Sequence, residues 1–465
     1  MKTTKRTLLG LAVAAALGSA GFANANTTSS AIRGDITGPN GEDAAGTTVV
    51  ITHVASGTSK TVTVNEAGIF TAQGLRVGGP YKVVIDSDVY RDAIVDNVFL
   101  SLGDTYRLDQ SLESADVETI TVTGSPILFN SSANDSYFGS EQIANTPSLN
   151  RDLKDVVKRN PLVVIKPGDD NAMTIAGSNP RMNSISIDGI PLNDDFGLNN
   201  NGYPTQRNPF PLDALDQVTV QIAPTHAKSS GFTGGGVDAV FKSGTNEITG
   251  NFFYEISNDD MAGTPENEGV EVPIEYEEEN YGFTIGAPII EDKLFFFAAY
   301  EKFESPQVLE YGAGGSTAGA NKTTVTADEV AKVKEIANRV YGLSDIGNFD
   351  TQPLLEDEKY IIKLDWNIND DHRANFVYMF NEGNDTRNMT SSDRELRLDS
   401  HWYNKFEELN NFSVKLFSDW TDEFSSEISV TQKSVETGQV SLNGGLGIGD
   451  VTIQNIDEDN DGNSD

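Results

Sequence analysis

The pattern of hydrophobic and polar positions divides the chain into two β-rich regions with a shorter mixed region between them. In the first β-rich region, short alternating segments are separated by turn residues such as Gly38, Pro39 and Gly41, and this spacing is typical of a β-sandwich. The expected strands cover residues 32–36, 47–53, 58–64, 68–74 and 81–86. We therefore predict an N-terminal β-sandwich within residues 26–113.

The second β-rich region begins near Thr245 and has longer alternating strands. Its clearest segment places Tyr360, Ile362, Leu364, Trp366 and Ile368 on one face, with Lys363, Asp365 and Asn367 on the other. Apolar-out, polar-in alternation over ~9–11 residues is typical of transmembrane β-strands. Seven such segments precede Asp465, whereas a plugged transporter barrel has about 22 strands. We therefore expect residues 244–465 to be the first part of an antiparallel transmembrane β-barrel, incomplete in this chain.

The region between them, residues 125–243, mixes helix and strand signals. A short helix is expected over residues 148–159, capped by Ser148 and ended by Pro161. Strands are expected at residues 162–166, 183–192 with a turn at Asp188 and Gly189, and 217–222. The pattern predicts a small mixed α/β domain. Its run of three glycines from Gly234 is not a phosphate loop, because Val237 follows instead of the Gly-Lys-Ser/Thr end.

The first 25 residues have the features of a secretory signal peptide. Lys2, Lys5 and Arg6 precede an apolar run over residues 8–20, and a small-residue cleavage site ends at Ala25. The run is shorter than the ~20 residues that a membrane-spanning helix needs. We expect export and cleavage after Ala25.

Composition narrows the function classes. The chain has 70 acidic and 33 basic residues, a formal net charge of −37 and no Cys. The charge argues against a nucleic-acid partner, and the missing thiols exclude disulfides, a thiol nucleophile and thiolate metal sites. Much of the acidic excess is assigned to expected barrel loops, at residues 266–279, 356–358 and 457–465.

Catalysis has little support in the sequence. The four histidines, His53, His226, His372 and His401, lie in four separate segments and in no known catalytic arrangement. Adjacent acids such as Asp194 and Asp195 are usually solvated. We therefore predict that the protein is not an enzyme.

A short extended segment follows the expected sandwich. Residues 118–124 alternate β-branched side chains and precede a Gly-Ser-Pro breaker that ends at Pro126. A peptide of this kind suits strand addition to the sheet edge of another protein.

The sequence motifs of these regions resemble those of one family. "IRGDITGPNGEDAAGTTVVI" and "VNEAGIFTAQGLRVGGPYKVVI" resemble the carboxypeptidase-regulatory-like domain. "LKDVVKRNPLVVI", "ISIDGIPLNDDFGLNNNG", "PLDALDQVTVQIAP" and "SGFTGGGVDAVFKSGTNEITG" resemble the plug of TonB-dependent outer-membrane receptors, and "ENYGFTIGAPIIEDKLFFFAAYEKF" resembles barrel strands of their Oar-like subgroup. The chain thus resembles an Oar-like TonB-dependent receptor.

The resemblance implies a location, an energy source and binding residues. The location would be the outer membrane of a Gram-negative bacterium, in contact with its lipid, with the sandwich and a TonB box in residues 114–124 facing the periplasm. TonB, driven through ExbB and ExbD, would bind Glu118, Thr119, Ile120, Thr121, Val122, Thr123 and Gly124. An extracellular ligand of unknown identity would bind the plug apex at Asn193, Asp194, Asp195, Asn199, Tyr203 and Arg207.

Several alternatives stay open at this stage. The cargo is expected to be a peptide or protein, but a SusC-like glycan importer with a surface lipoprotein, or a non-transporting surface or adhesion protein, would share these modules. A capping box at Thr326 and Glu329 predicts a helix to about Tyr341, either structural or partner-docking. No cofactor is certain, although Asp457, Asp459, Asp461 and Asp465 have the spacing of calcium-loop ligands.

Overall fold

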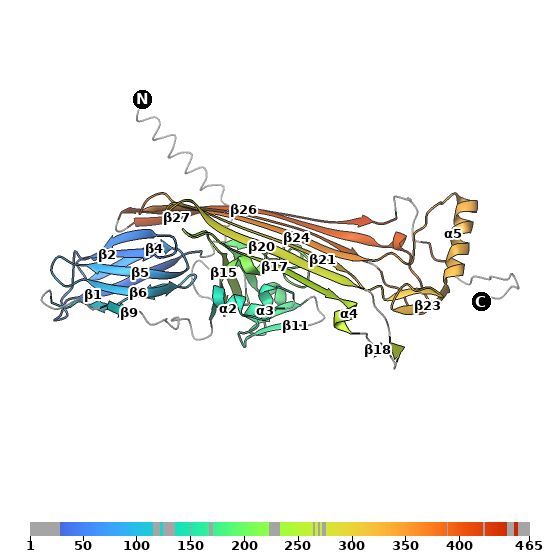
Figure 1. Ribbon diagram of the computed structural model, residues 1–465, viewed down its shortest axis with the longest axis horizontal. Coiled ribbons are helices and arrows are strands. Elements are labelled where there is room, and N and C mark those ends of the chain that lie inside the picture. The colour runs from blue at the N-terminus through green and yellow to red at the C-terminus, as the bar shows by residue number, and fades with distance from the viewer. Residues whose placement is uncertain are drawn as a thin grey trace, which may run out of the picture.

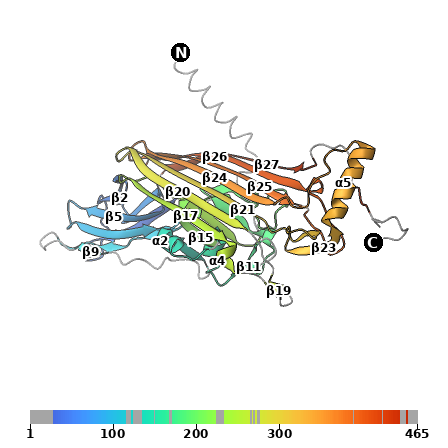
Figure 2. The same ribbon diagram turned by 45° about the vertical axis from the view of Figure 1, so that its right-hand side comes forward.

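The structure is a computed structural model (Figure 1), and it describes residues 28–114, 121–123, 135–148, 150–166, 171–222, 233–263, 266–267, 270–271, 276–387, 389–421, 424–443 and 451–453. A sandwich lies at one end, a long sheet runs along the molecule, and a small α/β domain lies under that sheet. The view in Figure 2 shows the same small domain beneath the long strands. The predicted signal peptide and its cleavage site at Ala25 lie outside the described residues.

The sandwich consists of two sheets packed around an apolar core. One has the order β4-β1-β7, with β8 also on β1, and the other has the order β3-β2-β5-β6-β9. Side chains alternate as the sequence predicts, so that Val49 and Ile51 of β2 point into the core. The sequence pattern missed β6, which completes the second sheet. The strands are β1 (Ser30–Thr37), β2 (Thr48–His53), β3 (Thr58–Thr63), β4 (Ile69–Leu75), β5 (Gly78–Asp86), β6 (Ala93–Leu100), β7 (Thr105–Arg107), β8 (Gln110–Ser111) and β9 (Thr121–Thr123).

The small α/β domain has a five-stranded sheet of order β10-β15-β16-β13-β14 and a separate hairpin, β11-β12. The predicted turn at Asp188 and Gly189 is present, with positive φ at both residues. Gly235 is closely packed, because a Cβ there would lie 2.3 Å from the side chain of Ile175. The elements are β10 (Ser136–Gly139), α2 (Ser140–Ala144), α3 (Leu153–Val157), β11 (Val163–Lys166), β12 (Ala172–Ile175), η1 (Pro180–Met182), β13 (Ser184–Ile187), β14 (Ile190–Pro191), η2 (Leu212–Ala214), β15 (Leu215–Gln221) and β16 (Gly236–Phe241).

The predicted cap of the helix after Ser148 is wrong. The helix α3 begins at Leu153, and Asp152 caps it by accepting a hydrogen bond from the backbone N–H of Lys154. The hydroxyl of Ser148 instead donates to the carboxylate of Asp155 at 2.6 Å. The apolar face of the helix is buried as expected, including Val156 and Val157.

The long sheet has seven antiparallel strands in sequence order, as the pattern predicts. Its edge strands, β17 and β27, do not pair with each other in the described residues, so the sheet is open. The strands contain 10 to 19 residues. They are β17 (Thr249–Asn258), β20 (Glu277–Ile290), β21 (Leu294–Pro306), β24 (Leu354–Asn367), β25 (His372–Arg387), β26 (Tyr403–Thr421) and β27 (Phe424–Ser441).

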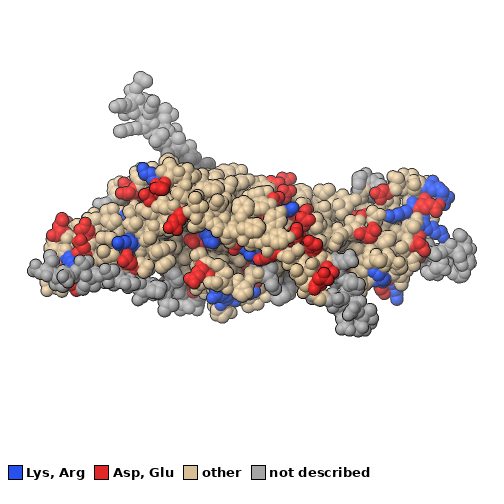
Figure 3. Space-filling view, viewed as in Figure 1, with Lys and Arg blue, Asp and Glu red and all other residues tan. Residues whose placement is uncertain are grey.

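The two faces of this sheet differ as the alternation requires. Ile362 and Trp366 are exposed on the outer face, whereas Lys363 and Asp365 are buried against the small domain. In Figure 3, uncharged surface covers most of this face, and Asp and Glu side chains are scattered over both ends and the middle of the molecule. The structure thus has an apolar outer band and a polar inner wall.

The two ends of the sheet also differ. The turn at Glu291–Lys293 and the other short turns face the sandwich, and long connections lie at the opposite end (Figure 1). In the long connections are α4 (Asp259–Ala262), β18 (Glu266–Asn267), β19 (Val270–Glu271), β22 (Tyr311–Gly314), β23 (Asn321–Thr326), α5 (Ala327–Tyr341) and η3 (Asp399–His401). The capping box of Thr326 and Glu329 at the start of α5 is confirmed. Among the described residues, no helix is long and apolar enough to cross a bilayer.

Two charged segments that were expected in loops lie in strands. Residues 277–279 begin β20, and residues 356–358 lie in β24. Asp357 is buried on the inner face, and Glu358 accepts hydrogen bonds from the hydroxyls of Tyr300 and Tyr360 at 2.8 and 2.5 Å. These tyrosine donors compensate the Glu358 carboxylate within the strand, which sequence alternation alone did not reveal.

Candidate functional site

The turn of the hairpin β13-β14 is held by two lysines of the inner wall. Lys363 lies 3.4 Å from the carboxylate of Asp188 and donates to the carbonyl of Phe241 at 2.8 Å. Lys415 donates to the carbonyl of Asp188 at 2.7 Å. Since the side chains of all three charged residues are nearly or fully buried, this contact fixes the α/β domain to the centre of the sheet.

A second contact centres on Arg151, just before α3, whose side chain is 12% exposed. Its guanidinium lies 2.6 Å from Asp213 of the same domain and 3.0 Å from Glu255 of β17. It also approaches Glu301 of β21 at 3.9 Å, and Lys359 lies 2.9 Å from the same Glu301. Sequence reasoning missed Arg151, because its partners come from distant strands.

The predicted ligand residues lie together in one loop of the α/β domain, but most of them already have partners. Asn199 donates to Glu407 at 2.9 Å and accepts from Lys405 at 2.7 Å. Asp195 pairs with Lys433 at 2.5 Å, and the carbonyl of Asn193 accepts from the same lysine. These contacts fix the loop against β26 and β27.

Tyr203 and Arg207 of the same loop point inward. Tyr203 is fully buried and donates to Asp152 at 2.9 Å; burial and the Asp152 carboxylate raise the pKa of its hydroxyl well above the usual value. The guanidinium of Arg207 lies 3.5 Å from the ring centre of Phe303.

The loop also carries two exposed apolar side chains that sequence reasoning missed. Phe196 and Leu198 are 61% and 56% exposed, and they flank a turn in which Asp194 accepts from the backbone of Phe196. Ligand binding by the loop stays a prediction, and these two side chains are its most accessible apolar contacts.

The segment predicted to bind TonB is only partly described. Its central residues form β9, which pairs in parallel with β6 of the sandwich. The ladder places Thr121 opposite Ile94, Val122 opposite Val95 and Thr123 opposite Asp96. Glu118, Thr119, Ile120 and Gly124 lie outside the described residues, as do all four predicted calcium ligands, Asp457, Asp459, Asp461 and Asp465.

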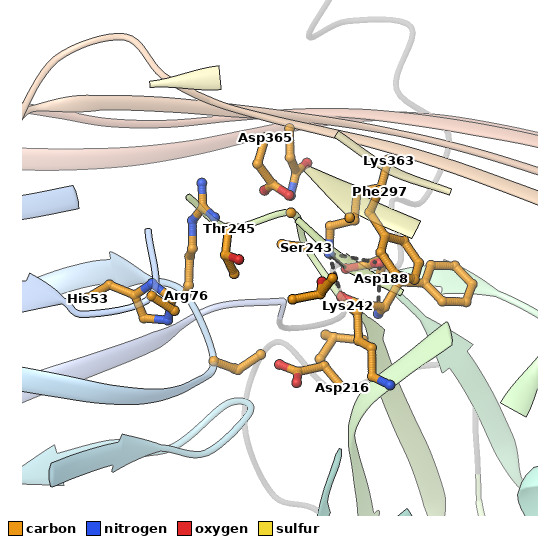
Figure 4. A pocket seen from close by; sticks show the side chains of 18 of the residues that line it. His53, Arg76, Asp188, Asp216, Lys242, Ser243, Thr245, Phe297, Lys363 and Asp365 are labelled. Atoms are coloured by element: carbon orange, nitrogen blue, oxygen red, sulfur yellow. Dashed lines mark hydrogen bonds and ion pairs between the residues drawn. The ribbon is translucent and has the colours of Figure 1, made fainter. Parts of the chain in front are cut away.

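A cavity of about 360 Å³ lies where the sandwich, the α/β domain and the long sheet meet (Figure 4). Charged side chains of all three parts line it, among them Arg76 of the sandwich, Asp216 of β15 and Asp365 of β24. Arg76 donates to Asn367 at 3.3 Å, and Arg373 of β25 donates to the carbonyl of Gly74 at 2.9 Å. The cavity is therefore bounded by polar contacts that fasten the sandwich to the end of the sheet.

His53 lies at the edge of this cavity, next to Arg76 (Figure 4). Its ring is buried, packs edge-on against Tyr81 and hydrogen bonds with Ser56 at 2.7 Å. Burial, together with the positive charges of Arg76 and Arg373, lowers the pKa of His53 to about 3. The site thus holds a neutral imidazole beside two cations.

Further contacts hold the sandwich in place. The backbone N–H of Asn246 donates to the carbonyl of Ala55 at 3.0 Å, and the backbone N–H of Leu102 donates to the side chain of Gln217. Lys60 and Asp419 form an ion pair at the β26-β27 turn. Together these contacts fix the sandwich against both the small domain and the short turns.

Three family models match successive parts of the chain. Residues 31–113 match the carboxypeptidase regulatory-like domain. Residues 128–237 match the TonB-dependent receptor plug domain, and residues 240–328 match an outer membrane beta barrel domain. The order of the three matches is the order predicted from the sequence.

Individual proteins are also similar. The TonB-dependent transporter Oar of Myxococcus xanthus is 27% identical over 231 residues, which cover 46% of this chain and 20% of that protein. The outer membrane transporter YddB of Escherichia coli has 13% identity and a TM-score of 0.47, over 64% of this chain and 38% of its own. The siderophore receptor PirA of Pseudomonas aeruginosa has 15% identity and a TM-score of 0.42, over 67% and 42%. The chain therefore spans about a fifth of the length of the curated relative.

Proposed function

We propose that this chain, an outer-membrane protein of the Oar-type TonB-dependent receptors, takes up a ligand through a plugged barrel with energy transmitted by TonB. On this proposal the α/β domain acts as the plug, and the inner wall of the long sheet holds it until TonB pulls.

The observation that carries the proposal is the set of polar contacts between the plug and the inner wall, which we call the polar seat of the plug. Lys363 and Lys415 of the wall hold Asp188 of the plug, and Arg151 of the plug meets Glu255 of β17. A buried ion pair adds little net stability, because desolvation offsets much of the attraction. When such groups separate in a water-filled barrel, water hydrates both sides. The seat therefore suits a plug that is positioned accurately and still released.

TonB would capture the segment of residues 118–124 by strand addition, which needs main-chain groups rather than particular side chains. The proton gradient of the inner membrane, acting through ExbB and ExbD, would supply the pull. Tension would then pass from this segment into the plug, which begins close behind it in the sequence.

The cargo is proposed to be a peptide or protein. It would first meet the loop of residues 193–199, where the exposed apolar side chains of Phe196 and Leu198 lie near the exposed carboxylate of Asp195. No catalytic step is part of this proposal. Calcium binding by the acidic run that begins at Asp457 stays a prediction, to be tested by calorimetric titration of Ca²⁺ into the chain.

Deletion of residues 118–124 tests the function. Uptake should be lost, while membrane assembly and ligand binding at the cell surface are retained. The readout is growth on defined peptides or proteins as the nitrogen source, with labelled cargo to measure surface binding. A matched variant replaces residues 118–124 with a Gly/Ser segment of equal length; it keeps the spacing and the main-chain groups but lacks the β-branched side chains that favour an extended strand, so uptake should be weakened rather than restored.

Unchanged uptake in the deletion strain would contradict TonB coupling. Surface attachment without any uptake in the parent strain would favour the non-transporting adhesion protein. Growth on glycans that depends on a neighbouring surface lipoprotein would favour the SusC-like importer.

A further inference from the structure

We propose that the β6 edge of the sandwich is a holding site for the TonB-binding segment of this same chain, and that TonB must take the segment from that edge before it can pull the plug. This rests on the proposed function, since it takes residues 118–124 as the segment that TonB captures. It gives the N-terminal sandwich a regulatory role in energy transfer.

The holding site is an edge of a complete sheet. β6 pairs on one side with β5, where Val95 lies opposite Val83, and on its other side with β9. Without β9, β6 would be an unpaired edge, with a row of free backbone N–H and C=O groups ready to accept a strand. The occupant is the centre of the predicted TonB-binding segment, Thr121–Thr123.

The sandwich that carries this edge is fixed to the periplasmic end of the sheet. Arg373 of β25 donates to Gly74, Arg76 donates to Asn367, and Lys60 pairs with Asp419. Tension applied to β9 while it is paired with β6 would therefore load the sandwich and its contacts with the barrel. Only after β9 leaves β6 can the same tension reach the plug.

The pairing is short enough to be reversible. A backbone hydrogen bond contributes about 1 kcal/mol net, so a three-residue ladder keeps most molecules closed without making release slow. A partner that binds only the released form has its apparent dissociation constant divided by the released fraction. Blocking release should therefore weaken TonB binding by at least about tenfold.

Hydrogen exchange on the full chain tests the exchange of partners directly. In the resting chain, the amides of residues 94–96 and 121–123 that point across the β6-β9 ladder should be protected, and the amides of β6 that point the other way are protected by β5. Saturation with the purified periplasmic domain of TonB should expose the β6 amides that point toward β9, while those bonded to β5 stay protected and serve as an internal control. Continued protection of every amide in 94–96 at saturation would overturn the proposal, because TonB would then add to the free side of β9.

A reversible lock gives a second test, made simple by the absence of Cys from the chain. Asp96→Cys and Thr123→Cys introduce one Cys at each of two positions that are backbone partners in the ladder. The oxidised double variant should bind the TonB domain at least about tenfold more weakly than the reduced one. Each single variant, which cannot form this bond, should bind equally under both conditions.

The two proposals fail in different ways. Equal binding by the verified disulfide form and its reduced form would overturn the holding site but leave TonB capture intact. Absence of TonB binding by the wild-type chain would overturn the proposed function itself. The exchange measurement gives its outcome whether or not the disulfide forms.

Discussion

The interior of the sandwich and the wall that faces the plug are built from different side chains. Among the described residues 28–114, Arg76 is the one buried side chain with a permanent charge, and it lies at the junction with the barrel. The wall strands β20 to β26 bury eight: Glu301, Asp357, Lys359, Lys363, Asp365, Asp385, Glu407 and Lys415. Apolar wall residues such as Phe297 and Met379 do join the plug core, so the seat is mixed rather than purely polar.

This difference in composition separates the part of the molecule that stays folded as a unit from the part that can be released. Exposing an apolar core to water costs free energy in proportion to the exposed surface. The sandwich therefore stays folded as a unit. The charged groups that hold the plug lose little free energy when water replaces their partners, because water hydrates the separated charges. The plug is therefore the part of the molecule that the composition of its contacts allows to move.

The largest effect should come from the sandwich core. Phe70→Ala removes a fully buried ring of β4, and the lost burial plus the remaining cavity should cost about 3–5 kcal/mol of unfolding free energy. Chemical denaturation of the purified chain, followed by a signal from the sandwich, would measure this. The control is Phe99→Ala, since Phe99 of β6 is 43% exposed. Equal losses in both variants would mean that the core is not the source of stability.

Removing the charge of one member of the ion pair that holds the plug should weaken plug retention more than removing the charges of both members. Lys363→Met leaves the buried carboxylate of Asp188 without its closest cation, which should weaken plug retention by about 3 kcal/mol. Adding Asp188→Asn removes the uncompensated charge, and asparagine tolerates the positive φ of 44° at this turn. Most of the loss should then be recovered.

Plug retention can be followed as the denaturant concentration at which a protease first cuts the plug. A double variant as weak as Lys363→Met would show that the seat depends on the ion pair itself. That result would remove the contrast between the seat and the sandwich core.

A smaller effect is expected from pH. His53 has a pKa of about 3 in the folded chain, below its ordinary value of about 6.5. The unfolded state therefore takes up a proton first as pH falls, and stability is fully present above pH ~6.5 and declines below it. Between pH 7.5 and 5.5 the sandwich should lose about 1.4 kcal/mol through this group.

His53→Gln provides the control for that loss. Glutamine does not titrate, so the difference in stability between the two pH values should shrink by the same amount. Thermal unfolding of wild type and variant at both pH values measures it. A variant that keeps the full pH dependence would place its cause in other titratable groups.

Local sequence patterns correctly predicted the features that depend on neighbouring residues alone. The seven long strands follow from alternation, and the turn at Asp188 and Gly189 follows from residues that tolerate positive φ. The helix cap was missed because Ser148 and Asp152 both offer a suitable oxygen, and the choice depends on Asp155. Arg151 was beyond sequence reasoning, since its partner Glu255 is 104 positions away.

The pairing of β9 with β6 likewise could not be predicted from local sequence patterns. The sequence marked residues 118–124 as a strand that would be added to a sheet, because its alternation is a local property. It did not show which sheet, because β6 was not recognised and the partner depends on how the chain returns after β8.

The smallest effect should come from the ion pair between Lys60 and Asp419, whose side chains are 16% and 26% exposed. Partly exposed pairs contribute at most about 1 kcal/mol, so Lys60→Ala should shift docking of the sandwich by that amount or less. Raising the salt concentration from about 0.15 to 1 M shortens the screening length from roughly 8 to 3 Å and should remove most of the difference between wild type and variant. Dyes on Val89→Cys and Ile289→Cys, both at exposed positions, would report docking by energy transfer. Lys82→Ala, an exposed lysine of β5, removes the same charge and should change nothing. An effect of Lys60→Ala well above 1 kcal/mol that persists in high salt would show that the sandwich is docked as stably as its own core is packed. In that case the contacts of the plug alone, and not those of the sandwich, would be releasable.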